Sequence, residues 1–398
     1  MSNLDFIIHS LNIANVSIDN VIKSCDTLTY FLSTNISTQT CPCCGHHTSY
    51  VHDYRTQKIK DLPIHRLKVS LVIKKRRYVC HHCGKKFYEF LPFIQKYKRV
   101  TDRLRQSVFI DLHEPYTMKN IASKHSVSTF FVQQVLDEMS IPIESPNNII
   151  AIDEFKGNAD GEKFQTIITD PVNKKVLNIL PDRHKLHIDK YFNSIPNKQN
   201  IRYVVMDMWK PYYDLAKQHF KNATIIIDRY HFVRQVVWAV ENVRKRVQRK
   251  LSKEDRKFFK HSKKLLLKSK ANLTIDELDN LYVMFTYSED LRLAYDLKHI
   301  FYDILKKRNK QEVKESLINY IEMLKDSKLK EFRECIRAFS NWLDPIANGI
   351  VETYNNAYTE GKNNKTKVLK RISYGIRTFK NLQKRILLIN KNLHFQDI

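Results

Sequence analysis

The chain has 398 residues, a length that accommodates two to four domains. Lys and Arg number 68 against 42 Asp and Glu, and the formal net charge of +26 indicates a polyanionic partner, most simply nucleic acid. The sequence has no apolar run of the roughly 18 residues that predict a membrane span, no signal-peptide pattern, and neither a Gly-x-Gly-x-x-Gly motif nor a Walker A loop, which disfavours membrane proteins and nucleotide-cofactor enzymes.

Residues 1–40 are mixed in pattern, and we expect a short helix or strand lead-in without a function of its own. Residues 41–95 carry a metal-binding pattern, in which two Cys-x-x-Cys pairs are each followed by Gly. Two such knuckles supply the four thiolates of a tetrahedral, structural Zn²⁺ site, so we predict a zinc ribbon. The predicted ligands are Cys41, Cys44, Cys80 and Cys83. Free buried thiols are the alternative; Cys43 is surplus, and the possible substitute ligands are His46, His47, His81 and His82.

Basic side chains are dense between and after the two Cys pairs. Residues 68–79 alternate apolar and basic side chains, as the long strands of a zinc ribbon do. A solvated charged face is the alternative to phosphate contact, which we favour beside a zinc ribbon and a helical module. The predicted phosphate contacts in this stretch are Lys74, Lys75, Arg76 and Arg77.

Residues 96–140 have the pattern of a helix-turn-helix. Thr101 can cap a first helix, Ile121 and Ala122 are expected core positions, and Ser128 is placed to cap the last helix, with Val127 in the turn. That last helix would enter a DNA groove, although a three-helix bundle that only packs shares the pattern. The side chains expected to face DNA are Ser128, Thr129, Phe130, Gln133 and Gln134. Two Pro within 141–146 then indicate a linker.

Residues 147–232 alternate between sheet and helix patterns. Strands are predicted at 148–155, 163–169, 175–180, 201–207 and 223–228, and helices at 184–193 and 209–220. This order is that of a ribonuclease H-like core, whose first and fourth strands lie side by side. The first strand ends at Asp153 and the fourth at Asp207, so the two carboxylates are expected to meet at the sheet edge where α/β folds place their sites.

A third acid at a strand end is Asp228. It could replace Asp207 as a metal ligand. We favour Asp207, because its strand lies beside the first strand in this core, and we expect Asp228 to anchor Arg229 or the helix that follows.

Residues 233–345 carry long amphipathic helical patterns without a strand pattern, so we predict an all-helical insertion in which Trp238 and Trp342 belong to the core. Residues 346–398 would complete the catalytic core with a final helix and a basic C-terminal segment.

Glu360 is the third predicted carboxylate, because it precedes a long basic segment without acids. Glu352, which also follows an Asn-Gly turn, is its rival. Three gathered carboxylates can hold two Mg²⁺ or Mn²⁺ ions, as sites that cut and join phosphodiesters do. At helical spacing the basic segment presents further DNA contacts on the face of Glu360 and beyond it. These are Asn363, Asn364, Lys367, Lys370 and Arg371.

Together these motifs resemble the ISL-three family of bacterial insertion-sequence transposases, which are DDE enzymes, over nearly the whole chain. The similarity rests on the two Cys pairs, the helix-turn-helix, IDEF around Asp153, VVMDMWKPY around Asp207, IDRYHFVR around Asp228, and YTEGKNNKTKVLKRISYGIRTF from Tyr358. The last segment is the most specific.

The resemblance implies that Asp153, Asp207 and Glu360 form the catalytic triad and that a helical insertion precedes the Glu. Ala357, where the family usually has Gly, and Thr366, where Ile is common, depart from the pattern without touching a proposed ligand. The implied fold is a multidomain α+β chain, with a zinc ribbon, a helix-turn-helix and a ribonuclease H-like core interrupted by the helical insertion.

The expected activity is transposition. The N-terminal modules would bind terminal inverted repeats of double-stranded DNA, and the carboxylates with two Mg²⁺ would cleave the strand and join its 3′ end to target DNA. Two ends must be cut together, so a homodimer or larger homo-oligomer is expected, in the cytoplasm at the bacterial nucleoid. The alternatives are a non-catalytic DNA-binding regulator and, more weakly, a general nuclease.

Overall fold

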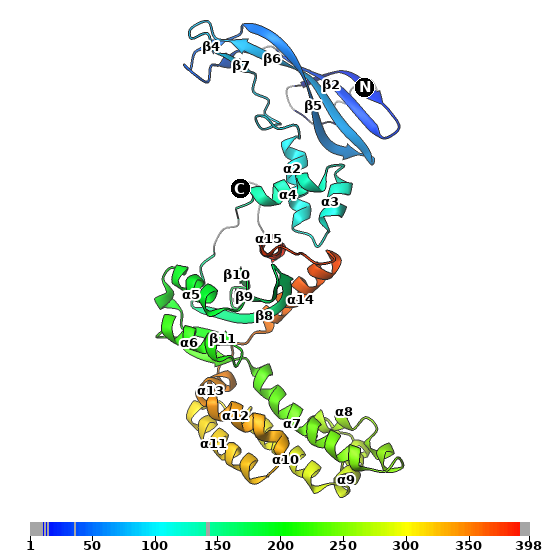
Figure 1. Cartoon of the computed structure of the whole chain (residues 1–398), viewed down its shortest axis with the longest axis vertical. Coiled ribbons are helices and arrows are strands. Elements are labelled where there is room, and N and C mark those ends of the chain that lie inside the picture. Colours follow the sequence, from blue (N-terminus) through cyan, green and yellow to red (C-terminus); the bar gives the residue numbers. More distant parts are fainter. Residues whose placement is uncertain (1–10, 12, 14–15, 36, 141–143, 391–398) are drawn as a thin grey trace. The chain divides into compact units, whose positions relative to one another are not determined.

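A computed structural model describes residues 11, 13, 16–35, 37–140 and 144–390. They divide into two compact units, each with its own hydrophobic cluster (Figure 1). Unit 1 contains the described residues of 1–141 together with 368–375, and unit 2 contains the described residues of 142–367 and 376–391. None of the helices in these residues combines the length and the apolarity that a membrane span requires.

Unit 1 is built on a five-stranded sheet with the order β1-β2-β6-β5, in which β7 also pairs with β6. β2 runs parallel to β6, and the other neighbours are antiparallel. Alternation along β6 buries Val69, Leu71 and Ile73 in the same cluster as Tyr30 of β2. The strands are β1 (Val16–Lys23), β2 (Thr27–Thr34), β5 (Val51–Ile64), β6 (Leu67–Val79) and β7 (Lys86–Tyr88), with a small hairpin of β3 (Gln39–Thr40) and β4 (His47–Thr48). The expected lead-in therefore contributes two strands to the sheet that carries the zinc-binding segment.

Three short helices follow in unit 1. Thr101, Thr117 and Ser128 each accept a backbone N–H bond at a helix N-terminus, as the sequence predicted for Thr101 and Ser128. The helices are α2 (Asp102–Leu112), α3 (Met118–Lys124) and α4 (Thr129–Glu138). Apolar side chains spaced three or four residues apart form their shared interior: Ile121, Ala122, Val132, Val135 and Leu136.

Unit 2 contains a second five-stranded sheet with the order β10-β9-β8-β11-β12. Its strands are β8 (Ile149–Ala159), β9 (Glu162–Asp170), β10 (Lys175–Leu180), β11 (Tyr203–Met206) and β12 (Thr224–Ile227). β9 and β10 are antiparallel additions, whereas β8, β11 and β12 run parallel. The first and fourth strands of this region therefore lie side by side, as the sequence predicted.

Helices cover both faces of the sheet in unit 2. The connections α5 (Lys185–Ser194) and α6 (Lys210–His219) contribute to the larger hydrophobic cluster, together with Ile150 and Ile152 of β8. Ile149 and Ala151 point to the opposite face, and α15 (Phe379–Asn390) contacts β8 and β10. Because β8 is buried on both faces, its sequence is a continuous apolar run instead of an alternating one.

The remainder of unit 2 is helical, and its described residues from 229 onward contain no strand. The helices are α7 (Arg229–Lys250), α8 (Ser262–Leu267), α9 (Ile275–Thr286), α10 (Glu289–Ile304), α11 (Lys310–Asp326), α12 (Arg333–Asn341), α13 (Leu343–Val351) and α14 (Ala357–Ile372). Helices α7 to α13 share one hydrophobic cluster with the sheet, and the end of α14, from Val368, belongs to unit 1. Trp342 packs against this cluster as expected, but the prediction for Trp238 is wrong, because its side chain is 51% exposed.

Helix α13 approaches the sheet closely at Gly349. A Cβ atom there would lie 2.3 Å from the carbonyl oxygen of Ile227 in β12 and 3.1 Å from Cε1 of Phe232 in α7. No side chain fits without moving backbone, so this glycine sets the contact between the helical segment and the sheet.

We predict that Gly349→Ala destabilises the protein by about 1–3 kcal/mol, the usual cost of overpacking. Gly361→Ala is the matched control, because Gly361 lies in α14 and a Cβ atom added to it would have no heavy atom within 4 Å. The control should be neutral or stabilising by roughly 0.5–1 kcal/mol, since Ala is the better helix former. Urea unfolding of both variants measures the difference, and equal stabilities would contradict the close approach at Gly349.

Candidate functional site

Four cysteine thiols converge in unit 1. The Sγ atoms of Cys41 and Cys83 are 3.6 Å apart, as are those of Cys44 and Cys80, and all four lie within 4.8 Å of one another. Zn–S bonds of about 2.3 Å in a tetrahedron require sulfur atoms about 3.8 Å apart, so this donor set fits Zn²⁺. A backbone hydrogen bond closes each knuckle: Gly45 N donates to the Cys41 carbonyl at 3.0 Å, and Gly84 N donates to the Cys80 carbonyl at 2.8 Å.

The possible substitute ligands lie outside this set of four. His46 and His82 stack with ring centroids 3.7 Å apart and form a second potential group with Cys44. Cys43 is exposed and joins neither group. The thiol cluster is therefore complete without histidine.

The basic stretch of β6 is not uniformly available to a phosphate. Arg76 is buried, pairs with Glu89 at 3.2 Å, and donates to Thr34 of β2. The expectation of a phosphate contact from Arg76 is therefore corrected, because this guanidinium links two strands and a carboxylate. Lys74 is exposed, while Lys75 and Arg77 are half-buried.

Helix α4 exposes most of the side chains that were expected to face DNA. Ser128, Thr129, Phe130 and Gln134 are exposed. Gln133 is half-buried and donates to Asp137 at 3.1 Å. Gln134 also lines a cavity of about 190 Å³ with Arg105 and Glu138.

Three aspartates lie at one level of three adjacent strands of unit 2: Asp207 and Asp228 directly follow β11 and β12, whereas Asp153 lies within β8, which continues to Ala159 instead of ending near Asp153. β8 and β11 pair in a register that sets Tyr203 opposite Ile149, and continuing it sets Asp207 opposite Asp153. The β11–β12 register, extended in the same way, sets Asp228 opposite Asp207. Parallel strands thus bring three carboxylates to one sheet edge.

Each aspartate has a different set of neighbours. His231, in the first turn of α7, places Nε2 2.8 Å from Asp207 Oδ1 and 4.0 Å from Asp228 Oδ2. Burial lowers the pKa of His231, but the hydrogen bond and charge of Asp207 together raise it by more, so the net shift is upward. Asp228 is buried and accepts a bond from the backbone N–H of Asn356 at 3.0 Å. It anchors the approach to α14, and it faces α7 only through His231, because it makes no side-chain cap. The expected anchoring of Arg229 is wrong, since Arg229 donates to the Leu305 carbonyl.

Asp153 lies closest to the helix that carries Glu360. The amide Nδ2 of Asn363 donates to Asp153 Oδ2 at 2.8 Å, and Asn356 Nδ2 donates to the carbonyl of Ile152 at 3.3 Å. Burial raises the pKa of Asp153 to about 7, with further increases from the charges of Asp207 and Glu360. Asp207 and Glu360 are therefore near enough for their charges to oppose the ionisation of Asp153.

Asn363 does not share the exposed face of Glu360, contrary to expectation. It is 5% exposed and points to the sheet, whereas Asn364, Lys367 and Arg371 are exposed and Lys370 is half-buried. The expectation that Asn363 contacts phosphate is corrected, since its amide is committed to Asp153.

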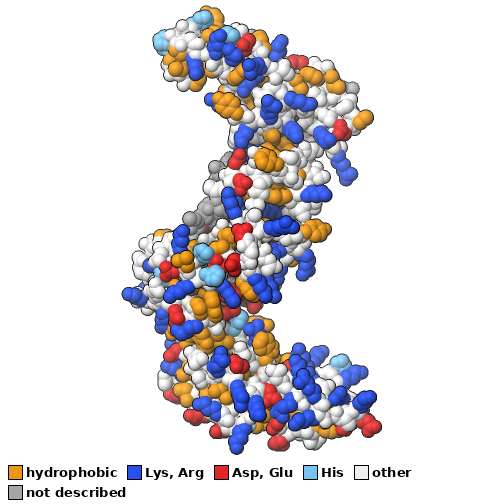
Figure 2. Space-filling model, in the orientation of Figure 1, with side chains coloured by type: hydrophobic (Ala, Val, Ile, Leu, Met, Phe, Trp, Pro, Cys, Tyr) orange, Lys and Arg blue, Asp and Glu red, His pale blue; other side chains and the backbone are white. Residues whose placement is uncertain are grey.

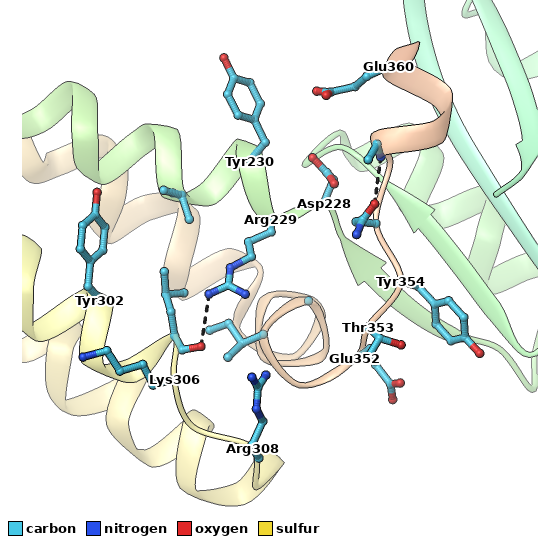
Figure 3. Close-up of a pocket in the computed structure, with 16 residues that line it drawn as sticks. Asp228, Arg229, Tyr230, Tyr302, Lys306, Arg308, Glu352, Thr353, Tyr354 and Glu360 are labelled. Atoms are coloured by element: carbon cyan, nitrogen blue, oxygen red, sulfur yellow. Dashed lines mark hydrogen bonds between the residues drawn. The ribbon is translucent and has the colours of Figure 1, made fainter. Parts of the chain in front are cut away.

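Glu360 and Glu352 differ in direction. Both line a cavity of about 830 Å³ at the junction of α7, α10, α13 and α14, which Asp228 also lines. Glu360 points toward the space above Asp228, whereas Glu352, at the end of α13, points away from it (Figure 3). The side chain of Glu360, and not that of Glu352, therefore points toward the aspartates of the sheet.

Comparison with known proteins identifies the family. Residues 150–386, more than half of the chain, match the family model of ISL3 DDE transposases, which is described as "Transposase". The chain belongs to the ISL3 transposase family. Residues 37–83 of this transposase match the zinc-finger of the transposases IS204, IS1001, IS1096 and IS1165, which supports a zinc ribbon with a structural Zn²⁺ on the four thiols.

Two curated relatives differ in extent. The transposase is 26% identical over 362 residues to the transposase for insertion sequence element IS1001 of Bordetella parapertussis, and the match covers 88% of each chain. It is also 34% identical over 125 residues to a Lactococcus lactis subsp. lactis protein described as an ATP-dependent protease, covering 31% of this chain and 38% of that protein. The shorter match carries no functional argument, because most of both proteins lies outside it.

Sequence reasoning missed three residues of the transposase's site. His231 follows Asp228 by three positions, and one helical turn after a strand end is the signal that could have placed it near the carboxylates. Asn356 and Asn363 lie near Glu360 in sequence, but only the sheet contact reveals that both reach back to β8.

We predict that Cys80→Ser loses the structural zinc, because three thiolates leave the closed tetrahedron incomplete. Zinc measured by mass spectrometry should fall from one ion per chain to nearly none. Cys43→Ser is the control, since this exposed thiol lies outside the cluster, and it should retain the ion. Equal loss from His82→Ala would show instead that the ligand set includes histidine.

Proposed function

We propose that this transposase cleaves DNA at the ends of its insertion sequence and joins the freed 3′ ends to target DNA, with Asp153, Asp207 and Glu360 as the catalytic carboxylates. The observation that carries the proposal is the convergence of two aspartates of neighbouring parallel strands, in matched register, with a glutamate from α14. The strand order supports a ribonuclease H-like core, interrupted after β12 by the helical insertion.

The donor set suits hard divalent cations. The three side chains offer only carboxylate oxygens, the ligands that Mg²⁺ and Mn²⁺ prefer, and the neighbouring charges that raise the pKa of Asp153 are those a cation would balance. When bound, two such ions would activate water or a 3′-hydroxyl and stabilise the leaving oxygen. Asn363 and His231 would orient Asp153 and Asp207 through the contacts described above.

Unit 1 is proposed to recognise the terminal inverted repeats. Its zinc ribbon and the α2–α4 helix-turn-helix would bind double-stranded DNA, with α4 entering a groove through Ser128, Thr129 and Gln134. Exposed cations would hold phosphates from both units. The candidates that remain are Lys74, Lys75, Arg77, Asn364, Lys367, Lys370 and Arg371. Because two ends react together, we propose a homodimer or larger assembly.

The test is cleavage of labelled DNA that carries an end of the element, with Mg²⁺. Asp207→Asn and Glu360→Gln should abolish nicking at the repeat end while leaving repeat binding intact, because both changes keep the size of the side chain and both residues lie in unit 2. Glu352→Gln should keep the activity, since that carboxylate points away from the aspartates. If wild type binds the repeat without cutting it, the protein is a DNA-binding regulator; if Glu352→Gln alone is inactive, the triad is misassigned.

We predict that Asn363→Ala raises the Mg²⁺ concentration needed for half-maximal cleavage by a larger factor than it lowers the maximal rate. Removing a hydrogen bond that orients a metal ligand typically costs roughly 10-fold to 100-fold in metal affinity, so half-maximal cleavage should need correspondingly more Mg²⁺. Asn193→Ala is the control, because it removes an exposed Asn–Asp hydrogen bond from α5. A lower rate at saturating Mg²⁺, with unchanged metal dependence, would assign Asn363 another role.

A further inference from the structure

An aromatic surface lies along the first turns of α7. Tyr230 and Trp238 are 56% and 51% exposed, although side chains of this size usually bury most of their area. The guanidinium of Arg234 lies between them, 5.3 Å from the Tyr230 ring centroid and 4.5 Å from that of Trp238. The three residues are spaced by four, so they follow one helix face at steps of about 6 Å. We name them the α7 ladder.

The ladder starts at the proposed catalytic site. Tyr230 lines the same cavity as Asp228 and Glu360. Its ring lies at the same end of that cavity as the Glu360 side chain (Figure 3). The next residue, His231, contacts Asp207. A polymer held at the carboxylates therefore meets Tyr230 first and can continue along α7 toward Trp238.

The charge around the ladder favours a polyanion. Among the described residues Arg234 forms no ion pair, and its buried Nε has no hydrogen-bond partner. Arg308, across the cavity, also forms no ion pair within the described part of the chain, and Arg229 donates only to a carbonyl. Lys and Arg side chains also gather over the region of α8 and α9 (Figure 2), where Lys257, Lys260 and Lys263 are exposed.

We propose that the α7 ladder stacks unpaired bases of the DNA strand that flanks the cleaved phosphate. This inference rests on the proposed function and specifies that the DNA substrate is locally unpaired beside the cleaved phosphate. Bases in a duplex already cover one another's faces, so an aromatic platform can accept only bases that have left the helix. An apolar protein partner would leave the Arg234 charge unmatched, whereas a nucleotide supplies both a ring for stacking and a phosphate for the guanidinium.

The probe is a fluorescein-labelled oligo(dT) of about 12 nucleotides, close to the span of single-strand sites, titrated into the full-length Asp207→Asn protein. Stacking contributes about 1–3 kcal/mol per base, so Trp238→Ala should weaken oligo(dT) binding between about fivefold and 150-fold. Binding of a fully paired hairpin should not change. Tyr282→Ala, which removes a 61% exposed ring from α9, should bind oligo(dT) as the parent does.

Tryptophan fluorescence reports the contact itself. The chain has three Trp, and stacking on Trp238 should quench part of their emission when unlabelled oligo(dT) binds. Trp238→Phe should keep most of the affinity and lose that part of the quenching. Parental oligo(dT) affinity in Trp238→Ala would overturn the proposal, and the ladder would then be a cation–π cluster that only stabilises the helix surface. A shift of Trp238→Ala toward smaller assemblies in light scattering, with unchanged oligo(dT) binding, would overturn it in favour of a second copy on this face.

The two proposals fail separately. If wild type cleaves repeat DNA and Trp238→Ala binds oligo(dT) as tightly as its parent, the ladder proposal is wrong and the catalytic proposal stands. If wild type does not cleave and Trp238→Ala binds oligo(dT) more weakly than its parent, the ladder binds bases and the catalytic assignment is wrong.

Discussion

The parallel register of β8, β11 and β12 is the constraint on which the rest of unit 2 depends. It sets Asp153, Asp207 and Asp228 at one level, so three carboxylates meet where β11 and β12 end beside β8. A shift of one residue in any of these strands would turn its aspartate to the other face of the sheet. β8 is buried on both faces, with Ile150 in one apolar cluster and Ile149 in the other, and its pairing with β11 holds Asp153 level with Asp207.

The surrounding groups offset part of this electrostatic cost. His231 lies against Asp207, Asn356 satisfies Asp228 through its backbone, and Asn363 donates to Asp153. These contacts also tie the first turn of α7 and the start of α14 to the strand ends. Burial, and then the charges of Asp207 and Glu360, still raise the pKa of Asp153, so the offset is incomplete in the protein alone. Such residual conflict between local chemistry and stability is expected at functional sites, where a ligand supplies the missing charge.

The sequence predicts features that depend on local pattern. Strand periodicity, helix caps such as Ser128 and paired cysteines all act within a few residues, so the order of elements in unit 2 and the four-thiol cluster could be read directly. Features set by long-range contacts could not. Arg76 looks like its basic neighbours, and only the pairing of β2 with β6 brings Thr34 to it and buries it. Asn363 follows the helical face of Glu360 by spacing, but α14 packs so that this amide turns to β8. The choice of Glu360 over Glu352 likewise depends on where α13 ends.

Trp238 shows the limit of a pattern argument most clearly, because tryptophan in an amphipathic helix is ordinarily core. Here α7 buries Phe232, Val236 and Val240 in the cluster shared with the sheet, which turns the face carrying Trp238 to solvent. The same packing makes the helical segment part of one hydrophobic core with the sheet, not a separate domain. α7 begins directly after Asp228, α13 rests on β12 at Gly349, and α14 returns with Glu360. Since one hydrophobic cluster joins α7 to the sheet, the packing that exposes Trp238 also fixes α7 beside the sheet edge that carries the candidate carboxylates. The exposed aromatic face of α7 is therefore placed by the buried face of the same helix, whose first turn also carries His231 to Asp207.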